Sequence, residues 1–97
     1  MAVYLIAYDL VRASHDDYKN VHEKIKEMSN DWARIQLSTF LINTTLRAKE
    51  IKNYLAPEFN KNEKLIVALL GNEISGLHEF SDEVSKWLAK NGYPVIL

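Results

Sequence analysis

The chain has 97 residues, of which 47% are hydrophobic and 10% aromatic, so we expect it to fold as one domain over residues 1–97. Its 12 basic and 13 acidic residues give a formal net charge of −1, which argues against a protein that coats nucleic acid non-specifically. The sequence contains no cysteine, no leader-like segment and no apolar run long enough to cross a membrane. Disulfides and thiolate metal sites are therefore excluded, and we expect a soluble, cytoplasmic protein.

An apolar run opens the chain and ends on a carboxylate. The segment AVYLIAYD predicts a strand over Ala2–Asp9 that is covered on both faces, or on one face and by a partner. Ser14 and Asp17 then resemble a capping box, and apolar residues recur at helical spacing behind them. We therefore predict an amphipathic helix from His15 to Ser29.

The next run, WARIQLSTFLINTT, is rich in β-branched and aromatic residues. It is long for a single strand, so we predict two strands that divide near Leu37–Ser38. Thr44 or Thr45 is expected to cap a second helix, which Pro57 should end near Leu55 or Ala56.

Another apolar strand is predicted at Leu65–Leu70, and Ser81 and Gly92 are expected to cap the two ends of a third helix. A short strand-like tail, YPVIL, ends the chain. The order strand–helix–strand–strand–helix–strand predicts an α+β, ferredoxin-like sandwich in which two helices cover one face of an antiparallel sheet. Leu65–Leu70 would then be an uncharged edge strand, which pairs readily with another chain unless something covers it. We favour cover by a second copy in a homodimer over cover by the third helix alone. The tail YPVIL is a further possible cover.

Several short motifs resemble those of a known family. The pair Tyr8–Asp9, the triplet Arg34–Gln36, and Ser38 with Phe40 occur in the order seen in the CRISPR-associated Cas-two proteins and the virulence-associated protein D toxins. The chain looks closest to the stand-alone, SinR-like homologues. It has fewer basic residues after Asp9 than CRISPR members often have, which weakens a role as a duplex-DNA adaptor.

The resemblance implies a ferredoxin-like homodimer in which the first-strand Asp of each subunit faces its mate. Several members of the family are metal-dependent nucleases, whereas others are structural platforms. Asp9 is accordingly the candidate for catalysis and for binding Mg²⁺ or Mn²⁺, because carboxylate oxygens suit hard cations. From its position alone, Asp9 could equally accept hydrogen bonds at the end of a strand.

Five residues are predicted to contact substrate near Asp9, namely Tyr8, Arg12, Arg34, Ser38 and Phe40. Arg12 lies close enough in sequence to contact a phosphate in the same loop, or it pairs with Asp16 on the surface. Tyr8 is also expected to pack within the sheet.

Two further groups have alternative interpretations. His15 and His22 share one helical face and could bind a metal ion, although a capped, solvated helix start explains this region better. Trp32 is expected to be the more exposed tryptophan and could line a groove or an interface, whereas Trp87 is expected in the core.

The sequence therefore predicts a metal-dependent endonuclease, acting on RNA more than on DNA, as a homodimer. The alternative is a scaffold dimer that binds nucleic acid or protein without catalysis. No second catalytic acid or base is evident beside Asp9, and the net charge is balanced, which favours the alternative.

Overall fold

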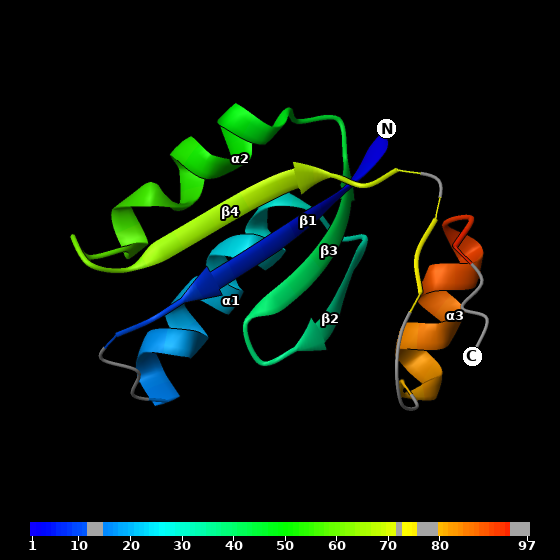
Figure 1. Cartoon of the computed structure of the whole chain (residues 1–97), viewed down its shortest axis with the longest axis horizontal. Coiled ribbons are helices and arrows are strands. Elements are labelled where there is room, and N and C mark those ends of the chain that lie inside the picture. Colours follow the sequence, from blue (N-terminus) through cyan, green and yellow to red (C-terminus); the bar gives the residue numbers. More distant parts are fainter. Residues whose placement is uncertain (12–14, 72, 76–79, 94–97) are drawn as a thin grey trace.

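The computed structural model describes residues 1–11, 15–71, 73–75 and 80–93. The elements in chain order are β1 (Ala2–Asp9), α1 (His15–Met28), β2 (Trp32–Gln36), β3 (Thr39–Thr44), α2 (Ala48–Leu55), a 3-10 turn (Ala56–Glu58), β4 (Lys64–Leu69) and α3 (Asp82–Lys90). The chain is thus an α+β protein with a four-stranded sheet and three helices in its described part (Figure 1).

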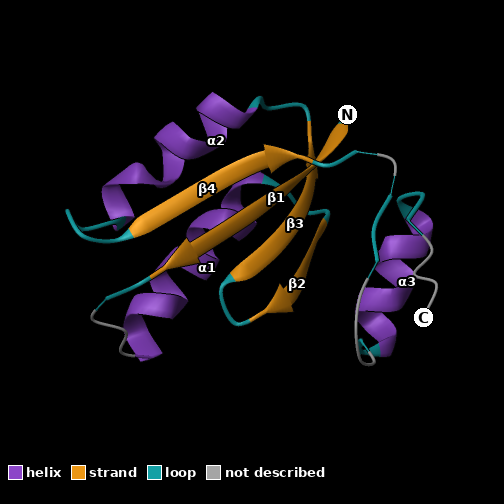
Figure 2. Ribbon diagram, viewed as in Figure 1, coloured by secondary structure: helices purple, strands orange, loops and turns teal. Residues whose placement is uncertain are grey.

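The strands lie in the order β2-β3-β1-β4, and each neighbouring pair is antiparallel. β1 is therefore a central strand, and β4 and β2 form the two edges of the sheet. Figure 2 shows the strands in front of α1, with α2 alongside β4 and α3 beyond β2 at the other end of the molecule.

The face of the sheet toward α1 and α2 carries the larger core. Alternate residues of β1 point to this face, and Ile6 and Tyr8 are buried there against Phe40 of β3. Ile25 of α1 and Ile51 of α2 are fully buried against the same side chains. We call this surface the α1/α2 face.

The opposite face, which we call the α3 face, carries a smaller core. Val3 and Leu41 are buried there together with Leu88, which is the fully buried residue of α3. Farther along the same face, over the end of β1 and over β4, Ile66 remains 62% exposed. The cover provided by α3 is therefore partial.

Two polar contacts hold the end of α3 against the sheet. Asn43 Nδ2 donates to Asn91 Oδ1 at 2.8 Å, and Lys90 Nζ donates to Asp31 Oδ1 at 3.3 Å. Gly92 follows with φ of +88°, a left-handed conformation that glycine adopts without strain at a helix end.

Most of the predicted elements are confirmed. The first strand has the predicted bounds, the division near Leu37–Ser38 is present, and Ser81 Oγ accepts a hydrogen bond from Val84 N at the start of α3. β4 lies at an edge, as predicted. Ser14 and the residues of the tail from 94 to 97 lie outside the described residues.

The predicted cap of the second helix is wrong. Thr44 remains in β3, paired with Ala2, and its Oγ1 accepts a hydrogen bond from Leu46 N at 3.2 Å. The helix begins after Arg47, whose backbone N–H donates to Glu50 Oε1 at 2.9 Å. The threonine thus shapes the turn that precedes the helix, and a glutamate satisfies the free amide.

Candidate functional site

Asp9 is the last residue of β1, and its side chain is exposed. Because neighbouring residues of a strand point to opposite faces, buried Tyr8 lies on the α1/α2 face and Asp9 on the α3 face. Its partner in register is Lys64, the first residue of β4. Asp9 therefore stands at one end of the uncovered part of the sheet.

A shallow depression of about 340 Å³ lies beside Asp9. It is lined by Ala7, Tyr8, Asp9, Lys64, Leu65 and Ile66. Among the described residues that line it, most are apolar and the charged side chains are those of Asp9 and Lys64. A cation would therefore meet one carboxylate and one competing ammonium group in this chain.

The turn between β2 and β3 lies next to the end of β1. Tyr8 N donates a hydrogen bond of 3.1 Å to the carbonyl oxygen of Ser38. The structure therefore brings Ser38 beside Asp9 through the backbone, as the sequence motif suggested.

Tyr8 and Phe40 lie in the core and not on the surface of this site. Phe40 is 0% exposed and Tyr8 6%, so neither side chain presents a surface to a ligand. Burial raises the pKa of the Tyr8 hydroxyl, which keeps this phenol neutral. We therefore leave both side chains out of the proposed site, where their effect is to position β1 and β3.

Arg34 is exposed on the edge strand β2. One guanidinium nitrogen donates to the carbonyl oxygen of Leu37 at 3.3 Å, which places Arg34 at the same end of the sheet as Ser38. The guanidinium group carries further N–H donors beside this one. The other predicted arginine, Arg12, lies outside the described residues.

His22 belongs to the same region, and the sequence did not indicate this. It is only 9% exposed, and its Nε2 lies 3.1 Å from the carbonyl oxygen of Leu37. Its ring packs 5.0 Å from that of Phe40, and burial lowers its pKa. His22 is therefore not part of a solvated helix start, and its contacts are with the β2–β3 turn.

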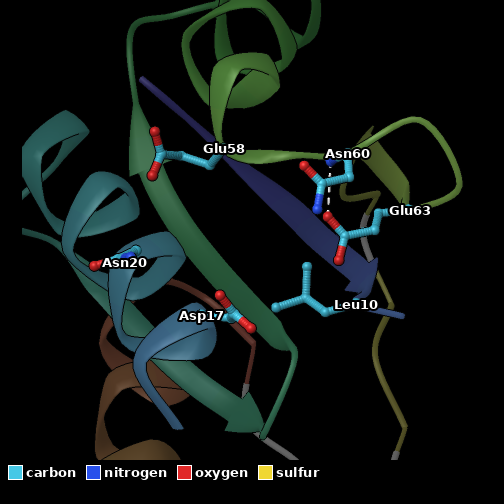
Figure 3. A pocket seen from close by; sticks show the side chains of 6 residues that line it. All are labelled: Leu10, Asp17, Asn20, Glu58, Asn60 and Glu63. Carbon is cyan, nitrogen blue, oxygen red and sulfur yellow. Dashed lines mark hydrogen bonds between the residues drawn. The ribbon is translucent and has the colours of Figure 1, made fainter. Parts of the chain in front are cut away.

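A second pocket, of about 310 Å³, is polar and acidic (Figure 3). Asp17 of α1 faces Glu58 and Glu63 across it. Glu63 accepts hydrogen bonds from Asn60 N at 2.7 Å and from Val11 N at 3.1 Å. These bonds give Glu63 a structural role in joining the loop before β4 to the end of β1.

In the described part of the chain, no three His, Cys, Asp or Glu residues are grouped so that they could hold a metal ion. Mg²⁺ and Mn²⁺ require several oxygen ligands, and Asp9 supplies one carboxylate. A single chain therefore does not fit the metal that the family resemblance implies.

Comparison with protein-family models finds no match for this chain, and comparison with curated proteins finds no similar sequence. Among the described helices, none has the length and apolar character needed to cross a membrane.

Proposed function

We propose that this chain is a metal-dependent phosphodiesterase of the Cas-two type, which acts as a homodimer on RNA more readily than on DNA. The observation that carries the proposal is the position of Asp9. Its carboxylate is exposed at the end of a central strand, beside the uncovered apolar surface around Ile66. A second copy packed on this surface around a twofold axis would bring two Asp9 carboxylates together.

We also infer that the fold is ferredoxin-like. The order of elements through β4 and the sheet order β2-β3-β1-β4 both support this inference. The free edge of β4 and the 62% exposure of Ile66, on the same face as Asp9, support association with a second copy.

The proposal requires two copies of the chain. One Asp9 is insufficient for a metal ion, and the ammonium group of Lys64 lies opposite it in register. Without a metal ion, two facing carboxylates would repel each other, so metal and dimer should stabilise each other.

The test is cleavage of an unstructured RNA and a matched DNA strand with Mg²⁺, Mn²⁺ or a chelator. Asp9→Asn should reduce cleavage to background while the chain stays folded and dimeric. Asp16→Asn, at an exposed aspartate of α1, is the matched control and should cleave like the wild type. Cleavage by Asp9→Asn at the wild-type rate would refute the proposal.

The second candidate is a scaffold dimer without catalysis. It is favoured by the lining of the Asp9 depression, in which the described residues include a lysine and no second acid or histidine. This candidate predicts stoichiometric binding of a nucleic acid or a protein, with no cleavage in the presence of any divalent metal.

A further inference from the structure

Lys64 stands beside Asp9 on the open part of the α3 face. The two residues pair in register on neighbouring antiparallel strands, so their side chains lie on the same face of the sheet. Residues paired in this way have Cβ atoms about 4.5–5.5 Å apart. Both side chains are exposed, and both residues line the depression of about 340 Å³. A ligand that contacts Asp9 therefore lies within reach of the Lys64 ammonium group.

The charge of Lys64 has no partner in the described part of the chain. Among the described residues, ion pairs form within α1 and between α3 and the loop before β2, and neither Asp9 nor Lys64 takes part in one. An exposed pair would contribute little to stability, so nothing in the fold requires these two charges to meet. The three N–H donors of the ammonium group are therefore available to a ligand.

The surroundings of Lys64 on this face are apolar. Ala7 and Ile66, which pair in register next to Asp9 and Lys64, also line the depression, and Ile66 is 62% exposed. Opposite charges attract each other more strongly where apolar groups exclude water, as they would once a ligand or a second copy covers Ile66. A bound phosphate would therefore gain more from an ammonium group here than on an open polar surface.

The formal charges of the proposed dimer indicate what Lys64 contributes. Two Asp9 carboxylates and one divalent ion sum to zero, which leaves no net attraction for a negatively charged phosphodiester. Two Lys64 ammonium groups, one from each copy, add two positive charges beside them. The same lysine that competes with a metal ion would thus attract the substrate.

We propose that Lys64 binds a phosphodiester group of the substrate beside Asp9, by donating hydrogen bonds from its ammonium group to a phosphate oxygen. This inference rests on the proposed function and identifies the substrate as a strand with at least two phosphates, one for each Lys64 of the dimer. Lysine binds phosphate as a compact charge, and a phosphate contact carries no sequence information. Binding should therefore depend little on the base sequence.

The test is the binding of a fluorescein-labelled, single-stranded oligoribonucleotide, measured by anisotropy over a range of salt concentrations. Asp9→Asn is the starting chain and a chelator is present, so the strand stays intact and no carboxylates repel each other at position 9. Each phosphate contact on a single strand contributes about 0.7 to the slope of log affinity against log salt concentration. Lys64→Met should therefore reduce the slope by about 0.7 in a monomer and by about 1.4 in a dimer. It should also weaken binding by roughly tenfold at low salt, equally for strands of different base sequence.

Two further variants show whether the charge at this position is responsible. Lys64→Arg keeps the positive charge and should bind within about threefold of the starting chain. Lys52→Met removes the same charge from exposed α2, across the sheet from Asp9, and should leave the slope unchanged. An unchanged slope in Lys64→Met, or a reduction no larger than that in Lys52→Met, would overturn the proposal. Lower stability of Lys64→Met with unchanged RNA binding would also overturn it, and would make Lys64 only the cross-strand partner of Asp9.

Cleavage assays with Asp9 in place separate this inference from the proposed function. Cleavage that requires Asp9, but proceeds at the wild-type rate in Lys64→Met, would leave the phosphodiesterase and remove the phosphate contact. Binding that depends on Lys64, without cleavage in any divalent metal, would support the contact and refute the phosphodiesterase. Binding of adenosine monophosphate as tight as that of the oligonucleotide would overturn the assignment to a strand.

Discussion

The two faces of the sheet differ in how completely they are covered. On the α1/α2 face, Phe40, Ile25 and Ile51 are 0% exposed. On the α3 face, Leu88 is equally buried, yet Ile66 of the same face is 62% exposed. The Asp9 depression lies where the cover of α3 ends. The α1/α2 face carries the larger core, which explains the stability of the fold, and the α3 face provides the surface available for function around Asp9 and Ile66.

The sharpest test of this contrast is a large-to-small change on each face. Phe40→Ala should lower the free energy of unfolding by ~3–5 kcal/mol, because it leaves a cavity in the larger core. Ile66→Ala, at an exposed position, should cost less than ~1 kcal/mol in the monomer. Urea unfolding at a protein concentration that keeps the chain monomeric measures both. Equal losses would show that the α3 face is as well covered as the other.

His22 should make the α1/α2 face sensitive to pH. Burial lowers its pKa in the folded chain, so the unfolded chain binds a proton at a higher pH. The associated stability is fully present above the unfolded pKa of about 6.5 and is lost as the pH falls through the folded pKa. The backbone contact to Leu37 opposes this shift, while nearby Arg34 adds to it.

Unfolding of the wild type and of His22→Gln, measured from pH 7.5 to pH 5, tests this prediction. The advantage of the wild type should shrink as the pH falls. The comparison with the variant removes the contribution of carboxylates, which titrate in both proteins. A constant difference across this range would contradict the prediction.

A charge on the exposed face should separate folding from association. Ile66→Lys should leave the free energy of unfolding of the monomer within about 1 kcal/mol, because the side chain is mostly exposed. It should abolish the proposed dimer, because an ammonium group would be buried in the interface. Sedimentation velocity measures the oligomeric state, and Lys52→Met on exposed α2 is a control for altered charge. A dimer that survives Ile66→Lys would place its interface elsewhere.

The smallest effect is expected at the end of α3. Lys90→Met removes the ion pair between Lys90 and Asp31, in which the lysine side chain is 68% exposed. Exposed pairs contribute little, so the loss should be at most about 0.5 kcal/mol, and α3 should stay docked through Leu88. Thermal unfolding measures the stability, and Trp87 fluorescence, recorded in a Trp32→Phe background because the chain has two tryptophans, reports the docking of α3. A shift of Trp87 emission toward that of exposed indole would show that the ion pair holds the helix.

Hydropathy periodicity predicted the elements well because each has a distinct pattern. The unbroken apolar run of β1 and the Ser81 cap of α3 both specify local structure. The start of α2 was misplaced because Thr44 has two possible uses, and pairing of β3 with Ala2 keeps it in the strand. A local pattern does not contain that long-range pairing.

The candidate site was predicted less completely. The sequence indicated Asp9 as an acid at the end of an apolar run, and a match of short motifs suggested Ser38 as its neighbour. It gave no sign that His22 would bond to Leu37, because that contact depends on how α1 packs beneath the β2–β3 turn. Trp87 was expected in the core; it packs there in part and also lines a hollow between α3 and β2, which forms only after α3 docks on β2.

The most direct test of the account is whether two Asp9 residues meet in solution. The chain has no cysteine, so Asp9→Cys introduces a single thiol, and Asn53→Cys on the exposed side of α2 is the matched control. The account predicts that a short thiol-specific cross-linker joins two Asp9→Cys chains quickly, at a yield unchanged by dilution within the range where the dimer persists. Cross-linking as slow as that of Asn53→Cys, in a protein that sediments as a monomer or as a dimer, would contradict a facing pair of Asp9 residues.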